Sequence, residues 1–481
     1  MPKTLDETYE RALQDIGDQN WEYAHRLFQC VSAASRPLRI EELAEFLAFD
    51  FITESIPKFV TDWRSEDPAH AVLSTCPSLL SVVDVAGSSV IQFAHFSVKE
   101  YLMSERLAEA NNTISRFHVS MALGHTIVAR ACLGVLLHLD VNITRDYVKE
   151  FPLAEYAAKH WVDHALFEGV SSNIQDGLKR LFHPNGRHLS VWVWIYDPES
   201  RRYRYRDTAA ELPSPARATT LHYAVICGLR DIVKFLIVTH RQNVNARGFD
   251  RNETSLIVAC RVGLPEVVRV LLEHGADKEA RDTFGWSPLE MASTTGHVEV
   301  IRMLLAHGID VNSRDTQGHT PLHAASRTGQ VAAARVLLEN GADVNAGRWD
   351  NQTPLHFAWN EAVTRVLIEH GAKKDSKDTA NRTPLHRALQ LERAEAVALV
   401  LLENGADVNS RDSDESTPLH IASGNGYFNL VRVLIQRGAD IHARSRGKTP
   451  LQLAIAQGHR DVMQLLLEHW ARDSRTQWSR V

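Results

Sequence analysis

The sequence has few cysteines, and their pattern excludes a cysteine-based framework. They are scattered and odd in number, and no two form a C-x-x-C pair: Cys30, Cys76, Cys132, Cys227 and Cys260. Such a set indicates neither a disulfide-rich secreted domain nor a zinc knuckle. We therefore expect a reducing compartment and a cytoplasmic location.

Long hydrophobic runs are also missing. No stretch approaches the ~18 consecutive apolar residues of a membrane-spanning helix. The most apolar segment, Ile127 to Leu139, contains Arg130 and His138, which favours a buried helix. The first ten residues, MPKTLDETYE, are polar and lack the apolar core of a signal peptide. We expect no membrane partner.

Positive charge is not in excess. The chain has 53 Lys and Arg against 59 Asp and Glu, and its formal net charge is −6. The charge balance therefore gives no overall attraction to nucleic acid, which is not an expected partner.

Catalytic and metal-binding motifs are absent. There is no G-x-S-x-G elbow, no H-E-x-x-H and no cysteine in a recognisable protease setting. His160 and His164 stand four residues apart on an expected helix, but no further zinc ligands lie nearby in the sequence. We interpret them as a structural pair and expect neither an enzyme, nor a metal, nor a cofactor.

The phosphate-binding pattern G-x-x-x-x-G-K-[ST] is absent as well. Gly447-Lys448-Thr449 is the one Gly-Lys-Thr sequence, and His442 stands where the motif requires its first glycine. This tripeptide is expected to form a turn before a helix, so no bound nucleotide is expected.

What the sequence does contain is a repeat, best seen in Thr320 to Asn345, TPLHAASRTGQVAAARVLLENGADVN. Thr-Pro is a typical helix start, since proline tolerates the first helical turn. Gly329 and Gly341 are placed to end two successive helices. The unit is therefore a helix–turn–helix followed by an extended crossing.

The unit recurs eight times across the second half of the chain. Its opening residues are Thr219, Thr254, Ser287, Thr320, Thr353, Thr383, Thr417 and Thr449. The spacings between them, by subtraction, are 35, 33, 33, 33, 30, 34 and 32 residues. A period of about 33 with the words TPLH and LLE-x-G-A-D resembles the ankyrin repeat family. The resemblance implies an α-solenoid that binds partner proteins along a concave strip.

A histidine follows most of these openings by three residues: His222, His323, His356, His386 and His420. A residue repeated in most units is expected to serve the scaffold and not catalysis. The ankyrin resemblance implies that it hydrogen-bonds the turn of the neighbouring repeat. Ile257, Glu290 and Gln452 replace it in the other three repeats.

The N-terminal region shows a different pattern. Helical spacing covers Leu5 to Val31 and Glu41 to Phe49, and strands are expected at Leu79 to Val85 and Val90 to Phe93, around a turn at Gly87 to Ser89. A helix is expected again from Ser97 to Leu107. Together these elements predict a winged helix.

Three N-terminal stretches resemble the winged-helix segment of fungal NACHT-type signalling proteins: PKTLDETYERAL, RPLRIEELAEFLAF and VIQFAHFSVKEYLMSERL. Two more, EYAAKHWVDHA and SVWVWIYD, resemble the segment that leads into the ankyrin array there. The nucleotide-binding module of that family has no counterpart in this sequence, so its NTPase activity is not carried over.

The predicted fold is mainly α, with five segments. They are a winged-helix-like domain at 1–110, a helical connecting region at 111–197, a linker at 198–216, ankyrin repeats at 217–470 and a polar tail at 471–481. The linker contains a basic run, Arg201 to Arg206, which would allow a nuclear address, an RNA-contacting arm or a solvated junction between domains.

Two repeats depart from the pattern. The fifth is only 30 residues long, with no glycine turn between Trp359 and Val363, and the sixth has Glu392 where glycine would fall. We expect the stacking to be disturbed there.

A partner-binding strip is predicted at the tips between repeats and at the ends of the first helices. Its residues are Phe284, Trp286, His319, Arg327, Thr328 and Trp349. Exposed aromatic residues mark interaction sites, although the same rings could instead pack on adjacent hairpins.

The sequence therefore favours a non-enzymatic interaction module or scaffold. The alternative is the regulatory part of a NACHT-type signalling switch. A DNA-binding winged helix is disfavoured by the acidic recognition-helix candidate with Glu41, Glu42 and Glu45.

Overall fold

The protein is seen in a computed structural model that describes residues 5–52, 54–76, 78–85, 87–110, 113–139, 143–199, 216–390 and 395–478, with side chains up to residue 472. The chain forms two compact units, Met1–Asn243 and Val244–Val481. The first helix pair of the repeat array belongs to the N-terminal unit. The basic run Arg201 to Arg206 and Glu392 lie outside the described residues.

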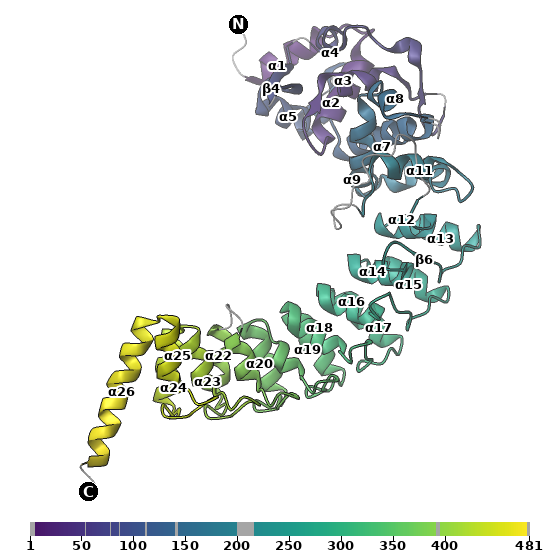
Figure 1. Ribbon diagram of the computed structural model, residues 1–481. Helices are drawn as coiled ribbons and strands as arrows, with labels where there is room; N and C mark the ends of the chain where they lie inside the picture. Colours follow the sequence, from purple (N-terminus) through teal and green to yellow (C-terminus); the bar gives the residue numbers. More distant parts are fainter. Residues whose placement is uncertain are drawn as a thin grey trace. The chain divides into compact units, whose positions relative to one another are not determined.

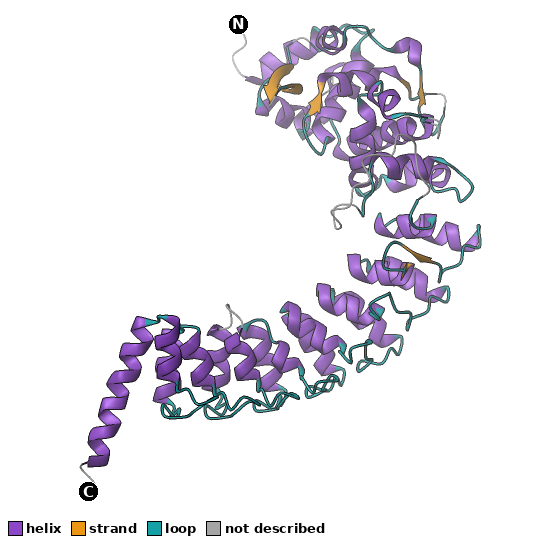
Figure 2. Cartoon of the chain, in the orientation of Figure 1, coloured by secondary structure: helices purple, strands orange, loops and turns teal. Residues whose placement is uncertain are grey.

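The N-terminal unit begins with a winged helix. Helices α1 (Leu5–Gln14), α2 (Trp21–Ala33) and α3 (Ile40–Glu45) accompany a three-stranded sheet of order β1-β5-β4. Figure 2 shows the strands in orange among the purple helices of this unit. Its strands are β1 (Leu38–Arg39), β4 (Leu80–Val85) and β5 (Ser88–Phe93). The two predicted strands are confirmed. The turn predicted at Gly87 to Ser89 is too long, because Ser88 and Ser89 pair with Val85 and Asp84 in the ladder.

The acidic helix α3 does not present its carboxylates as predicted. Glu42 is fully buried and accepts hydrogen bonds from Arg36 and Arg39. Glu45 is also buried and accepts from the Leu153 amide at 2.8 Å. Two of the three carboxylates therefore hold the fold together, and only Glu41 is exposed.

Short elements complete the winged-helix region: η1 (Phe46–Ala48), β2 (Phe49–Asp50), β3 (Lys58–Phe59), η2 (Thr61–Trp63), α4 (Pro68–Thr75), α5 (Phe96–Leu102), α6 (Glu105–Ala108) and η3 (Thr113–Phe117). The helical region follows with α7 (Met121–His138), α8 (Arg145–Lys149), α9 (Leu153–Ala165), η4 (Ser171–Ile174), α10 (Gln175–Leu181), α11 (His188–Ile195), α12 (Thr220–Ile226) and α13 (Arg230–Val238).

Helix α7 is the core of this region. Within the described residues it is the one helix long and apolar enough to cross a membrane by length and composition, and 56% of that window is buried inside the protein. It packs against α2 and α9. The prediction of a buried helix over Ile127 to Leu139 is confirmed, because Val128 to Leu136 is almost entirely inaccessible to solvent.

The C-terminal unit is a stack of helix pairs, each led by the predicted Thr or Ser (Figure 1). The short strands β6 (Arg247–Gly248) and β7 (Glu253–Thr254) precede it. First helices are α14 (Ser255–Val262), α16 (Pro288–Thr295), α18 (Pro321–Thr328), η5 (Pro354–Phe357), α21 (Pro384–Gln390), α23 (Pro418–Gly424) and α25 (Pro450–Gln457). Second helices are α15 (Pro265–Glu273), α17 (Val298–Ala306), α19 (Val331–Glu339), α20 (Glu361–Glu369), α22 (Glu395–Glu403), α24 (Phe428–Gln436) and α26 (Arg460–Trp478).

Successive first helices contact one another, and successive second helices do the same, so the repeats form two rows. The first helix of the fifth repeat is a single 3-10 turn, η5, in agreement with its short spacing. Helix α26 continues past Trp470 to Trp478, so part of the segment expected as a polar tail is helical.

Candidate protein-binding face

In four of the repeats the histidine joins its repeat to the next. In repeats four to seven the histidine Nδ1 lies within 3.0 Å of the hydroxyl of the opening threonine. Nε2 donates to a carbonyl of the following repeat: His323 to Gln352 at 3.0 Å, His356 to Arg382 at 3.0 Å, His386 to Ser416 at 3.0 Å and His420 to Lys448 at 3.2 Å. We call this bond the histidine joint.

The histidine joint requires a neutral imidazole with its proton on Nε2, because Nδ1 accepts the backbone N–H of the opening threonine. Burial favours that form. It lowers the pKa of His323 to about 4 and lowers the pKa of His356, His386 and His420 as well. These side chains therefore serve the scaffold and are poor candidates for general bases.

The third repeat carries Glu290 in place of this histidine. Glu290 is buried and accepts from the Ser287 amide at 2.6 Å, which caps α16, but its Oε1 has no hydrogen-bond partner among the described residues. Glu290 has no Nε2–H donor, and no hydrogen bond from its side chain to the following repeat is seen among the described residues. The histidine joint is therefore absent between the third and fourth repeats.

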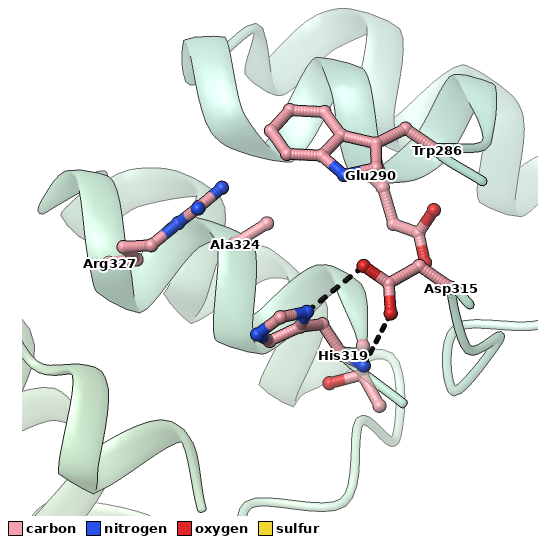
Figure 3. Close-up of a pocket in the computed structure, with 7 residues that line it drawn as sticks. Trp286, Glu290, Asp315, His319, Ala324 and Arg327 are labelled. Carbon is pink, nitrogen blue, oxygen red and sulfur yellow. Dashed lines mark hydrogen bonds and ion pairs between the residues drawn. The ribbon is translucent and has the colours of Figure 1, made fainter. Parts of the chain in front are cut away.

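A small pocket of about 10 Å³ lies at this position, room for about one water molecule. Trp286, Glu290, Asp315, His319, Thr320, Ala324 and Arg327 line it (Figure 3). The Arg327 guanidinium lies 5.2 Å from the centre of the Trp286 ring. His319 donates from Nδ1 to Asp315 at 3.0 Å, and its Nε2 lies 3.2 Å from Arg348. Three residues of the predicted strip, Trp286, His319 and Arg327, are thus brought together.

The other predicted residues lie along the same repeats. Phe284 and Trp349 are 57% and 69% exposed, yet each also contacts a neighbouring hairpin. The Arg251 guanidinium lies 5.0 Å from the Phe284 ring. Trp349 donates from Nε1 to the Thr316 carbonyl at 3.0 Å and covers Gly318, where a Cβ would lie 3.2 Å from the ring. Thr328 is exposed, but its hydroxyl donates to the Ala324 carbonyl of its own helix.

Sequence reasoning missed three residues of this face. Phe357 lies 5.5 Å from His319 and 5.8 Å from the Arg348 guanidinium. Trp359 is 53% exposed, and its amide donates to the Ser326 carbonyl of the fourth repeat. Arg387 follows on α21. The short spacing of the fifth repeat could have pointed to Trp359. Its first helix ends at Phe357, so Trp359 stands where the other repeats continue their first helix.

His160 and His164 do not converge on a common site. His164 is fully buried between the Tyr156 hydroxyl at 2.9 Å and His125 Nδ1 at 2.8 Å, and burial lowers its pKa to about 3. His160 faces Asp163 at 3.2 Å. Among the described residues, no group of three or more potential metal ligands was found.

A larger cavity of about 410 Å³ lies in the N-terminal unit. Its charged lining combines three cations with two carboxylates, namely Arg39, Arg145, Lys149, Glu41 and Glu155. Arg145 lies over Trp194 at 4.7 Å. Because both signs of charge line the cavity, it selects no single class of ligand.

Comparison with known protein families decides the assignment of the repeats. The model described as "Ankyrin repeats (3 copies)" matches residues 200–282, 279–348, 345–412 and 401–477, which together cover more than half of the chain. The chain belongs to the ankyrin-repeat family. Residues 9–115 match a second model, "GPI inositol-deacylase, winged helix domain".

Curated relatives share parts of this ankyrin-repeat chain. "Azaphilone pigments biosynthesis cluster protein L" of Monascus ruber is 28% identical over 58% of the chain and 60% of its own length. "Regulatory protein NPR5" of Arabidopsis thaliana is 36% identical over 24% of the chain and 26% of its own length. "Protein phosphatase 1 regulatory subunit 27" of Mus musculus is 37% identical over 19% of the chain and 58% of its own length. The chain thus spans less than two thirds of each of them.

Proposed function

We propose that this ankyrin-repeat protein is a non-enzymatic scaffold that binds a partner protein through the third to fifth repeats. The supporting observation is the grouping of Trp286, His319 and Arg327 around one pocket, beside the exposed rings of Phe284, Trp349 and Trp359. Large aromatic residues and arginine dominate the energetics of protein interfaces. Ankyrin repeats as a class serve protein–protein interaction, and the concave strip is where we place the contact.

The experiment compares stability with capture. Trp286→Ala and Trp349→Ala are made in the full chain, and partners captured from a cell extract are identified by mass spectrometry. Loss of a captured protein with an unchanged melting temperature supports the proposal, since removal of an interface anchor costs ~2 kcal/mol or more. Trp63→Ala is the matched control, because Trp63 is 51% exposed in the N-terminal unit. Unchanged capture per folded molecule would show that the two rings only support the hairpins.

A second candidate function is the regulatory part of a NACHT-type signalling switch whose NTPase is supplied separately. The match of residues 9–115 to a winged-helix domain favours it. Co-purification with an NTPase, released by nucleotide exchange, would support this function. If the captured partners include no NTPase, only the scaffold function remains supported.

We also propose a cytoplasmic location. All five cysteines are free and buried, as suits a reducing compartment. A fluorescent fusion tests the location, and nuclear accumulation that is lost when Arg201 to Arg206 are changed to glutamine would contradict it.

A further inference from the structure

Strand β4, which is labelled in Figure 1, lies at the edge of the three-stranded sheet of the N-terminal unit. It pairs with β5 on one side, and β5 is the one described element that packs extensively against it. The strand is open to solvent along most of its length, because Val82, Val83 and Val85 are 38%, 36% and 54% exposed. Valine has a high strand propensity, so β4 is an exposed edge that is well suited to further strand pairing.

The ladder with β5 shows which backbone groups of β4 face the open side. The Ala94 amide donates to the Leu79 carbonyl at 3.0 Å, and the same register continues along the whole strand. Hydrogen-bonded pairs alternate in an antiparallel ladder, so Val83 bonds to β5, whereas Val82 and Asp84 direct their N–H and C=O groups away from it. Among the described residues, no hydrogen bond to the amide of Val82 or Asp84 is seen. The occupant that satisfies such a row of donors and acceptors is another extended strand.

This edge lacks the features that usually prevent pairing. Edge strands are commonly protected by lysine, by proline, by a bulge or by a covering element. The sequence of β4 is LSVVDV, without lysine or proline, and its six residues pair with β5 without a bulge. Its single charged side chain, Asp84, accepts a hydrogen bond from Ser89 Oγ at 2.8 Å. The edge is therefore free to accept a further strand.

We propose that β4 pairs with β4 of a second copy of this chain. The two strands run antiparallel about a two-fold axis, and the two three-stranded sheets become one sheet of six strands. Every copy carries the same open edge, and a two-fold interface is self-complementary, so the chain itself supplies the partner strand. The interface lies in the N-terminal unit and is independent of the partner-binding repeats.

The side chains of β4 select the position of the two-fold axis. An axis at Asp84 would place two carboxylates directly opposite each other, which is destabilising. An axis at Val82 would make the pairing depend on Leu80, which is buried. An axis at Val83 places Val82 of each copy opposite Asp84 of the other, and each of these two pairs exchanges two backbone hydrogen bonds. The axis at Val83 is therefore the register that uses the outward groups.

This register gives each position of β4 a different neighbour. The two Val83 residues face each other as a non-hydrogen-bonded pair, with about 4.5 Å between their Cα atoms. Val85 lies opposite Ser81 of the second copy, and four residues separate it from the second Val85, a distance of about 14 Å. Cross-linking at single positions can therefore distinguish this pairing from random collision.

The first experiment measures the mass of the full chain by sedimentation velocity over a range of concentrations. The strand supplies about six residues a side, against about 20–30 in a standard interface, so we expect a weak dimer that forms at tens of micromolar. Val83→Lys should raise the dissociation constant at least tenfold, because it places two ammonium groups at the axis. Val82→Pro should do the same, because it removes an outward N–H and leaves the bonds to β5 intact. Val238→Lys is the matched control, since Val238 is 55% exposed at the end of α13, and it should have no effect.

The second experiment tests the register with disulfides. The five natural cysteines are buried, so an introduced cysteine is the reactive one. With oxidised glutathione, Val83→Cys should join two copies at least ten times faster than Val85→Cys, because a disulfide needs Cα atoms about 4.4–6.8 Å apart. A mixture of Ser81→Cys and Val85→Cys should form the mixed dimer faster than Val85→Cys joins to itself.

Several outcomes would overturn the proposal. They are a monomer at every concentration up to about ten times the expected dissociation constant, a dimer unchanged by Val83→Lys, equal cross-linking of Val83→Cys and Val85→Cys, and growth beyond the dimer. The last outcome would show an open assembly, whereas a two-fold interface closes. Melting temperatures control for unfolding, and if Val82→Pro melts early, Val83→Lys decides.

Discussion

Glu290 occupies a position that five other repeats give to histidine. Burial, reinforced by the nearby Asp315, raises the pKa of Glu290 to about 7, against the lowering influence of the Ser287 amide and Arg281. The folded-state pKa lies above the unfolded value, so the cost of ionising Glu290 is full above pH 7 and disappears as the pH falls toward 4.5. The residue lowers stability most at neutral and alkaline pH.

We therefore expect Glu290→His to stabilise the chain by about 1–3 kcal/mol at pH 8, because it restores a donor and removes an unpartnered carboxylate oxygen. Urea unfolding at pH 8 and pH 5 measures the free energy, and the gain should shrink at pH 5. Equal gains at both pH values would contradict the role of ionisation.

The repeat histidines give the opposite dependence. The folded-state pKa values of His323, His356, His386 and His420 lie below the unfolded value of 6.5, so their contribution to stability is full above pH 6.5 and is lost as the pH falls through the lowered pKa values. For His323, with a pKa of about 4, the loss at pH 5 is about 2 kcal/mol.

His323→Gln should flatten this pH dependence. Glutamine keeps a donor but does not titrate, and Gln452 already caps the eighth repeat by accepting from the Thr449 amide at 2.9 Å. The free energy of unfolding is compared at pH 7.5 and pH 5. An unchanged slope would show that the pH dependence arises elsewhere.

For single residues, the sequence predicted where in the repeat a side chain lies but not which neighbour the side chain contacts. The repeat period placed Trp286, Phe284 and Trp349 at hairpin tips, where they are found. It could not show that Arg327 would turn onto Trp286, or that Trp349 would cover Gly318, because side-chain direction depends on contacts 30 or more residues away. The role of these residues in binding stays a prediction.

At the scale of elements, the fifth repeat compensates for its missing helical turn with side-chain bonds. Asn360 Oδ1 accepts from the Val363 amide at 2.9 Å and so caps α20. Its Nδ2 donates to the Gly329 carbonyl of the fourth repeat at 3.1 Å. One side chain thus starts a helix and holds the neighbouring repeat.

Asn360→Ala should lower the free energy of unfolding by about 1–2 kcal/mol, the usual value of a lost helix cap. Asn360→Asp is the control, because aspartate keeps the cap but cannot donate to Gly329. The aspartate variant should recover most of the loss. A full loss with aspartate would assign the effect to the bond between the repeats.

Elements with a regular period were predictable and irregular ones were not. The two winged-helix strands follow from their apolar, β-branched runs around a turn, and the repeat openings follow from the period of about 33 residues and from the TPLH word where it occurs. The 3-10 turn η5 and the extension of α26 do not, because a short helix and a helix end are set by packing and capping. The carboxylates of α3 misled for the same reason: Glu42 is charged, yet the folded chain buries it, and it pairs there with the partly exposed Arg36 and Arg39.

At the scale of the molecule, the array depends on bonds between neighbouring repeats. Side-chain amides add a second set of such bonds: Asn245, Asn312, Asn345 and Asn409 each donate to a glycine carbonyl of the next repeat. The stability of such a stack is approximately a sum of repeat and interface terms.

Hydrogen exchange should therefore report the weaker repeats. The first helix of the fifth repeat has one 3-10 turn, so its amides, together with those of the sixth repeat, should exchange faster than those of the fourth. Mass spectrometry with peptide resolution measures this, and uniform protection from the third to the seventh repeat would contradict it.

The whole chain is also expected not to bind ATP. Gly447-Lys448-Thr449 lies in a loop, and Thr449 accepts from the Gln452 amide to cap α25, as Thr254 and Ser287 cap α14 and α16. Titration with a fluorescent ATP analogue tests this, and stoichiometric binding at micromolar concentration would contradict it.

The histidine joint reaches only to the adjacent repeat, and this has a mechanical consequence. Under tension at the C-terminus, the last repeat can detach without loosening the joints behind it. A released repeat of about 33 residues would extend by roughly 11 nm. The repeats would thus unfold one at a time under force, and the length of a pulled molecule would increase in steps of one repeat.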